Sequence, residues 1–178
     1  MAKARPVEGL DPDVSFAEAA ARVLEVRAAE VWEHAPGILD VDDIERVHDM
    51  RVATRRLRAV LEIFAPAFPR RARKRVLRDV KALADALGER RDPDVQIAAL
   101  RDYAKTAPAG DGAGVRLLVD DLRAEQATGN GTLAATVAEM ERRDLRGRLA
   151  ELVAAAREAA PPGHREAAPA EPGEAAPG

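Results

Sequence analysis

The feature that most constrains the fold is the spacing of the apolar residues between positions 47 and 64. On a wheel of about 100° per residue they fall within about 100° of one another, which is the core face of an amphipathic helix. They are Met50, Ala53, Leu57, Val60, Leu61 and Phe64. Aromatic residues form only 3% of the chain, while Ala, Leu, Arg and Glu dominate. Because these residues favour helices and no strand pattern occurs, the sequence predicts an all-α antiparallel helical bundle.

Capping and breaking residues predict where the first helices begin and end. Ser15 with Glu18 is typical of a capping box, and Pro36-Gly37 predicts the end of that helix near His34. A second helix is expected from Asp40–Asp43 to just before Pro66.

The remaining helices are predicted in the same way. A third helix should begin near Pro69 and end at a Gly88 cap, and a fourth should run from Asp92-Pro93 to about Lys105. After a loop at 108–114, we expect helices over 115–127 and 133–159, separated by a break or kink at Gly129-Asn130-Gly131.

The domain organisation follows from these elements. One helical domain is expected over residues 13–159, between a flexible leader (1–12) and a disordered tail (160–178) of Pro, Ala, Glu and Gly. The chain has no cysteine, which excludes disulfides and thiolate metal sites. No signal peptide or membrane-spanning run is evident, so a cytoplasmic protein is expected by elimination.

Charge is distributed unevenly along the chain. Residues 45–91 hold 14 Lys/Arg and 6 Asp/Glu, a net of +8, and the other residues hold 14 and 25, a net of −11. The net charge of −3 therefore averages two unlike regions. This asymmetry indicates a localised surface that faces an anion.

The basic residues of the second and third predicted helices form two rows. His48, Arg51, Arg55 and Arg58 follow i, i+3, i+7, i+10 spacing nearly opposite the core face, over about 80° and about 15 Å. Arg71, Lys74, Arg78 and Lys81 repeat the spacing. Arginine donates two parallel hydrogen bonds to an oxyanion, so such rows suit a linear polyanion.

Other interpretations of the rows remain open. They can be ordinary solvated helix faces, a nucleic-acid surface, or a protein-interaction module whose arginines pair with carboxylates such as Asp120, Asp121 and Glu125. His48 has no second His or Cys within one turn and no Ser/Asp arrangement, so neither a zinc site nor a triad is indicated. With no phosphate loop and no isolated carboxylate pair, we expect neither enzymatic activity nor a cofactor.

Two segments carry a resemblance to a known family. V-H-D-M-R-V-A-T-R-R-L-R-A-V-L-E-I-F at 47–64 and L-G-E-R-R-D-P-D-V at 87–95 resemble the CHAD domain, the conserved histidine α-helical domain. The resemblance implies two similar four-helix bundles related by pseudo-two-fold symmetry. It also implies a basic groove that binds inorganic polyphosphate, and association with polyphosphate granules. The matching positions are His48, Arg51, Arg55, Arg56, Arg58, Lys74, Arg78, Lys81 and Arg91, and Asp92 is expected to act as a helix cap.

The sequence departs from the family pattern in its C-terminal half. A second basic helix is expected there, but after residue 145 the sequence offers only Arg146, Arg148 and Arg157 before the Pro/Ala-rich tail. We therefore expect a single half-length copy of the domain. A homodimer would restore the two-fold arrangement, and the alternative is a truncated member with an open basic face that binds weakly. The E-x-E-x-K strand motif of the triphosphate tunnel domains that accompany some family members is also missing.

Overall fold

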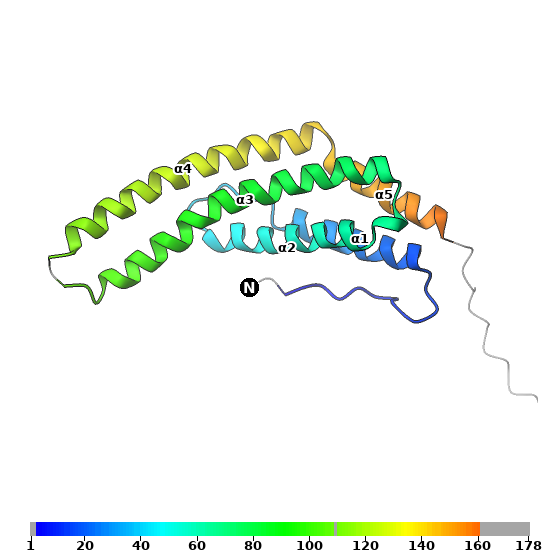
Figure 1. Cartoon of the computed structure of the whole chain (residues 1–178), viewed down its shortest axis with the longest axis horizontal. Helices are drawn as coiled ribbons and strands as arrows, with labels where there is room; N and C mark the ends of the chain where they lie inside the picture. Colours follow the sequence, from blue (N-terminus) through cyan, green and yellow to red (C-terminus); the bar gives the residue numbers. More distant parts are fainter. Residues whose placement is uncertain (1–2, 109, 161–178) are drawn as a thin grey trace, which may run out of the picture.

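Every regular element of the chain is a helix in the part that the structure, a computed structural model, describes: residues 3–108 and 110–160. Figure 1 shows the elements in chain order: α1 (Phe16–Glu33), α2 (Ile44–Ile63), the short 3₁₀ turn η1 (Ala65–Ala67), α3 (Arg70–Ala104), α4 (Gly112–Arg142) and α5 (Leu145–Ala159). The predicted all-α class is confirmed. No helix in the described ranges is both long and apolar enough to cross a membrane.

The helices pack as an antiparallel bundle around one main core. α1 lies against α2 and α5, α2 lies against α3, and α3 also contacts α4 and α5. The predicted core face of α2 is confirmed, since Met50, Ala53, Leu57, Val60 and Leu61 are buried. Phe64, at the end of this helix, is partly buried against the same core.

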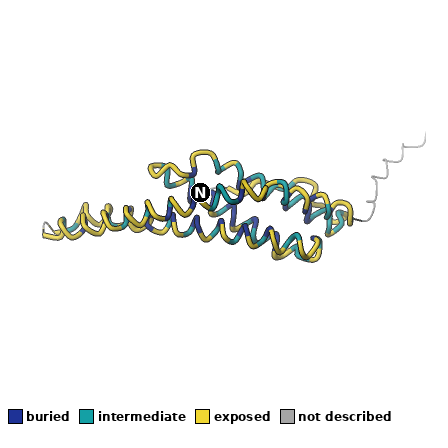
Figure 2. The backbone as a smooth tube through the Cα atoms, turned by 90° about the horizontal axis from the view of Figure 1, so that it is seen from above, coloured by how far each residue is buried: buried dark blue, intermediate teal, exposed yellow. Residues whose placement is uncertain are grey.

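A long hairpin projects from the bundle. The last third of α3 and the first part of α4 (residues 95–123, here called the arm) extend past α1 and α2 (Figure 1), and this end of the molecule is mostly exposed (Figure 2). Its own small cluster of buried residues consists of Ile97, Val115 and Val119. Leu117 and Leu118 on its surface are 69% and 53% exposed. The arm is therefore held mainly by the pairing of α3 with α4.

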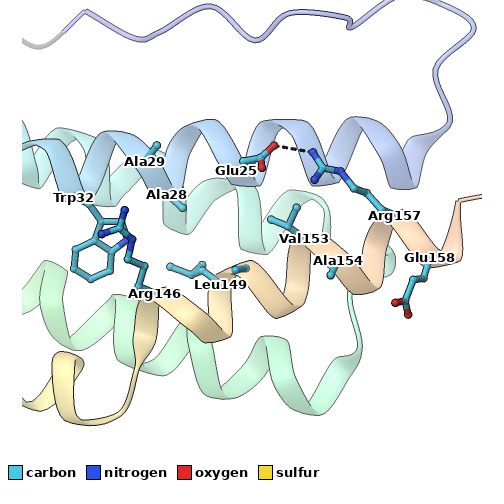
Figure 3. A pocket seen from close by; sticks show the side chains of 11 residues that line it. Glu25, Ala28, Ala29, Trp32, Arg146, Leu149, Val153, Ala154, Arg157 and Glu158 are labelled. Carbon is cyan, nitrogen blue, oxygen red and sulfur yellow. Dashed lines mark hydrogen bonds and ion pairs between the residues drawn. The ribbon is translucent and has the colours of Figure 1, made fainter.

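An apolar groove of about 640 Å³ lies between α1 and α5. Figure 3 shows Trp32 and Arg146 at one end and the 2.7 Å hydrogen bond from Arg157 Nη2 to Glu25 Oε2 at the other. Leu149 and Val153 of α5 lie between them. None of the residues of the two predicted basic rows lines this groove.

The predicted start of α1 and the segment before it are well defined. Ser15 Oγ accepts a hydrogen bond from the Glu18 amide at 3.2 Å, which confirms the cap. Upstream, the Arg5 amide donates to Glu30 Oε1 at 2.6 Å, and Arg27 Nη2 donates to the Arg5 carbonyl at 2.9 Å. These contacts fasten part of the leader to α1. Its flexibility stays a prediction, and the predicted tail, apart from Ala160, lies outside the described residues.

The predicted break between a third and a fourth helix is wrong, because α3 runs unbroken through Gly88, Asp92 and Pro93. Asp92 is therefore an exposed residue inside a helix and not a helix cap. Pro93 has no amide hydrogen and leaves the carbonyl four residues earlier without its helical donor. α4 packs against α3 before Pro93, where Gly129 meets Glu89 and Arg90, and after it, where Val115 and Val119 pack with Ile97. This packing outweighs the local cost.

The predicted break at Gly129-Asn130-Gly131 is also wrong, because α4 continues through it to Arg142. Gly129 serves the close approach of two helices instead. A Cβ atom built on Gly129 would lie 3.0 Å from the Glu89 carbonyl oxygen and 3.1 Å from the Arg90 Cα. The absence of a side chain at this position therefore lets α4 lie directly against α3.

The actual break falls later, at Arg143 and Asp144, and the sequence patterns did not reveal it. Asp144 has a left-handed backbone with φ of 47°, which Asp tolerates better than most residues. Its Oδ1 accepts a hydrogen bond from the Gly147 amide at 2.9 Å and so caps α5. This turn sends α5 back against α1 and α3.

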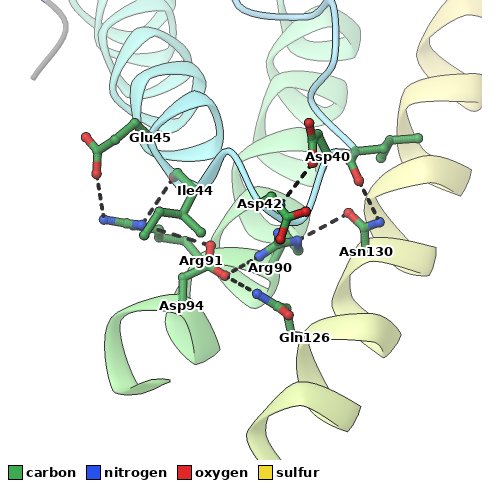
Figure 4. A network of polar contacts seen from close by, with 10 residues as sticks. Asp40, Asp42, Ile44, Glu45, Arg90, Arg91, Asp94, Gln126 and Asn130 are labelled. Carbon is green, nitrogen blue, oxygen red and sulfur yellow. Dashed lines mark hydrogen bonds and ion pairs between the residues drawn. The ribbon is translucent and has the colours of Figure 1, made fainter. Parts of the chain in front are cut away.

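A buried polar network joins α3, α4 and the loop before α2 (Figure 4). Arg90 is fully buried, its Nη1 donates to Asp94 Oδ1, and its Nε donates to Asn130 Oδ1 at 3.2 Å. Asp94 Oδ1 also accepts from Gln126 Nε2 at 2.6 Å. Asn130 Nδ2 in turn donates to the Leu39 carbonyl at 3.1 Å. The network therefore fixes where α2 begins relative to the α3–α4 hairpin.

Two glycine substitutions test the close helix approach. We expect Gly129→Ala to lower the free energy of unfolding by about 1–3 kcal/mol, because its methyl group would overlap the α3 backbone. Gly131→Ala is the matched control in the same helix, since a Cβ there meets nothing within 4 Å. It should raise stability by about 0.5–1 kcal/mol through helix propensity alone. Urea unfolding followed by circular dichroism measures both, and equal changes would contradict the close approach.

Candidate polyanion-binding face

The predicted row on α2 lies on the surface opposite the core. Arg51 and Arg55 are exposed, and His48 and Arg58 are half-buried. On the other side of the same helix, Leu57 is 1% exposed. The helical periodicity thus placed these four basic residues on the outer face correctly.

The row on α3 is exposed in the same way. Arg71, Lys74 and Arg78 are exposed and Lys81 is half-buried, while the core of α3 is formed by buried residues such as Val76, Val80, Leu83 and Leu87. The nearest carboxylate to Arg78 is that of its neighbour, since Nε lies 3.8 Å from Asp79 Oδ1. We define the basic face as His48, Arg51, Arg55 and Arg58 of α2 together with Lys74, Arg78 and Lys81 of α3.

One carboxylate joins the two rows. Glu62 Oε1 accepts a hydrogen bond from Arg58 Nε at 3.1 Å and lies 3.4 Å from Lys81 Nζ. The hydrogen bond from Arg58, together with the weaker influence of Lys81, holds the pKa of the Glu62 carboxyl below its usual value. Glu62 is therefore ionised at neutral pH, and two cations from different helices converge on one acceptor.

Four of the remaining side chains of the face have no internal partner in the described ranges. Among the residues that the structure describes, Arg51, Arg55 and Lys74 make no hydrogen bond or ion pair, and neither does His48. Arg51 and Arg55 are one helical turn apart and carry like charges, which repel mildly unless an anion lies between them. These side chains are free to bind an external anion.

The interpretation in which the arginines pair with the chain's own acidic segment gains no support from these contacts. Of the three acidic residues considered for this role, Asp120 forms an ion pair, but its partner is Arg123 of its own helix, at 3.1 Å. None of the described contacts links Asp120, Asp121 or Glu125 to α2.

Two residues carried over from the family pattern are engaged inside the protein. Arg91 has a side chain only 15% exposed, and its Nη1 donates to the Ile44 carbonyl at 3.2 Å. It also lies 3.8 Å from Glu45 Oε1 and 3.9 Å from Asp94 Oδ2, at the start of α2. Arg56 is half-buried and has an internal contact. Arg56 and Arg91 thus have contacts inside the protein, whereas Arg51 and Arg55 are exposed and unpaired.

Three arginines near and within α5, Arg143, Arg148 and Arg157, are held by carboxylates of α3 and α1. Asp79 of α3 is 2% exposed and accepts from Arg148 Nη2 at 2.7 Å and from Arg143 Nη1 at 3.3 Å. Arg157 donates to Glu25. These contacts attach α5 to α3 and α1, so Arg148 and Arg157 serve packing and do not form a second free row.

The sequence patterns did not predict the buried ion pair of Arg90 and Asp94. They also did not predict that Asp79 binds Arg143 and Arg148. A signal for the first was present, since Arg90 and Asp94 stand at i, i+4 on a helix where ion pairs form readily. Their burial could not be seen from spacing alone, because long charged residues are normally exposed. Among the described residues, no cluster of His, Cys, Asp and Glu could hold a metal ion.

Comparison with known proteins agrees with the features described above. A family model described as CHAD domain matches residues 22–176. Neither the curated proteins nor the solved structures gave a significant match. The match includes both basic rows and the segment that holds Arg90 and Asp94. With the family model covering most of the sequence, the chain belongs to the CHAD domain family.

Proposed function

We propose that this protein binds inorganic polyphosphate on the basic face without altering it chemically. The observation that carries the proposal is the arrangement of cations on two adjoining helices. Arg58 and Lys81 converge on a single oxygen atom, and unpaired Arg51, Arg55 and Lys74 extend the positive surface along both helices. A single anionic group would need one such pair, whereas a linear polyanion can use them all.

Polyphosphate suits this face for physical and family reasons. Its phosphate groups follow one another closely and carry charge along the whole chain, like the cations along α2. Arginine forks can donate two hydrogen bonds to each phosphate, and release of counterions adds to the affinity. The CHAD family as a whole is linked to polyphosphate binding.

Binding without catalysis is part of the proposal. Arginine and lysine side chains bind and orient an anion, and they dominate the face. His48 stands beside them as a further donor, and the described contacts give it no carboxylate or hydroxyl partner. We further propose that binding brings the protein to polyphosphate granules in the cell, as the family resemblance implies.

We also propose that the protein acts as a homodimer. The resemblance implies two basic halves. Of the three arginines after residue 145 in the described residues, Arg148 and Arg157 are paired internally, which leaves only Arg146 for a second row. A second copy would supply the missing half. Light scattering on a micromolar sample should give twice the mass of the chain. A mass equal to that of one chain, unchanged by added polyphosphate, would contradict the dimer.

A triple substitution tests the face. We expect Arg51→Ala, Arg55→Ala and Arg58→Ala together to weaken binding of long-chain polyphosphate on the order of 100-fold at low salt, because each charge-assisted hydrogen bond to phosphate contributes about 1 kcal/mol. Titration calorimetry measures the dissociation constant. The fold should persist, because all three residues lie off the core face.

The arm offers a matched control for this variant. Arg101→Ala, Arg116→Ala and Arg123→Ala remove the same charge from exposed helical positions. Arg123 pairs with Asp120 at 3.1 Å, as Arg58 does with Glu62. At physiological salt, where charges farther than about 8 Å are largely screened, the control variant should bind within about 3-fold of wild type. Equal losses of affinity in the two variants would show that net charge, and not the face, determines binding.

Salt dependence and competition distinguish polyphosphate from nucleic acid. The logarithm of the association constant should fall linearly with the logarithm of salt concentration, and the slope should be shallower in the triple variant. At physiological salt, RNA or DNA added at equal phosphate concentration should displace little bound polyphosphate, because the face lacks aromatic groups on which bases stack. Complete displacement by nucleic acid would favour that ligand instead.

A further inference from the structure

The carboxylate of Glu62 lies between two cations of the basic face, Arg58 and Lys81. It follows His48, Arg51, Arg55 and Arg58 at the same helical spacing, so it points to the same side of α2. Its Oε1 takes the hydrogen bond of Arg58 Nε and the nearest approach of Lys81 Nζ, at 3.1 and 3.4 Å. An oxygen atom of a phosphate group would make the same two contacts.

All three members of this cluster are open to solvent. The side chains of Arg58, Glu62 and Lys81 are 43%, 42% and 44% exposed. Exposed ion pairs contribute little to stability and exchange partners readily. A polyanion can therefore bind Arg58 and Lys81 without disturbing the core. To do so it must displace the Glu62 carboxylate and overcome the repulsion from its negative charge.

We infer that Glu62 is an internal competitor for the polyanion, which occupies Arg58 and Lys81 in the free protein and weakens the binding of phosphate at that point of the face. The inference rests on the proposed function and adds to it a residue that sets the affinity. The unpaired Arg51, Arg55 and Lys74 then bind the ligand first, and the Arg58–Lys81 pair is engaged only when the ligand displaces the carboxylate.

A competitor and a positioning residue predict opposite outcomes when the charge of Glu62 is removed. If Glu62 mainly held Arg58 and Lys81 in place for the ligand, its removal would weaken binding. If it competes, the removal of its charge strengthens binding. Glu62→Gln separates the two roles, because the amide keeps an oxygen acceptor for Arg58 and lacks only the negative charge.

The test is a titration of the full chain with long-chain polyphosphate at low and at physiological salt. We expect Glu62→Gln to bind on the order of 4-fold more tightly than wild type at low salt, the effect of one unit charge about 5 Å away in water. The gain in affinity should shrink as salt rises. Asp121→Asn is the control, since it makes the same charge change at an exposed position of the arm, and it should change affinity by less than about 2-fold.

The outcomes separate this inference from the proposed function. If wild type binds polyphosphate and Glu62→Gln binds it equally or more weakly, Glu62 is not a competitor. The basic face would still be the binding site. A similar gain in affinity in Glu62→Gln and Asp121→Asn would also overturn the competitor role, because net charge alone would then explain the effect. Wild type that fails to bind would overturn the proposed function and this inference together.

Discussion

The burial of Arg90 and Asp94 between α3 and α4 is the constraint on which the rest of the arrangement depends. Two charges removed from water are costly unless they meet each other and further partners. Here Asn130 accepts a hydrogen bond from Arg90, Gln126 donates one to Asp94, and Asn130 also donates to the Leu39 carbonyl ahead of α2. Because α2 is fixed at its start in this way, it lies against α3, and the two basic rows meet where Glu62 joins Arg58 to Lys81.

Two groups of arginines in this chain differ in their surroundings. Arg90 and Arg148 are buried or half-buried, point to carboxylates and connect helices. Arg51 and Arg55 are exposed and have no partner among the described residues. The first group stabilises a fold that offers few aromatic residues for packing, since these form only 3% of the chain. The second group gives the surface its charge, and Glu62 moderates that charge at one point.

The periodic features of the sequence predicted the helical class, the core face of α2 and the exposed basic rows, because a helix repeats its orientation every few residues. Features that depend on a neighbouring helix were not predictable in the same way. Gly129 is typical of a helix break in isolation, but it allows α4 to contact the Arg90 backbone. Pro93 is likewise tolerated inside α3, because α4 packs against the residues of α3 that precede Pro93 and those that follow it. The left-handed turn at Asp144 depends on a single cap to Gly147, which no periodic pattern signals.

The central claim is that polyphosphate contacts the arginines of α2 directly, and arginine side-chain resonances report such contact residue by residue. In a nuclear magnetic resonance titration of the labelled full chain with polyphosphate, the Nε–H signals of Arg51, Arg55 and Arg58 should shift together and saturate at one concentration. The signals of Arg90 and Arg148, which donate to internal carboxylates, should stay in place. Unchanged signals from the α2 arginines, with shifts confined to the arm or to α5, would contradict the account.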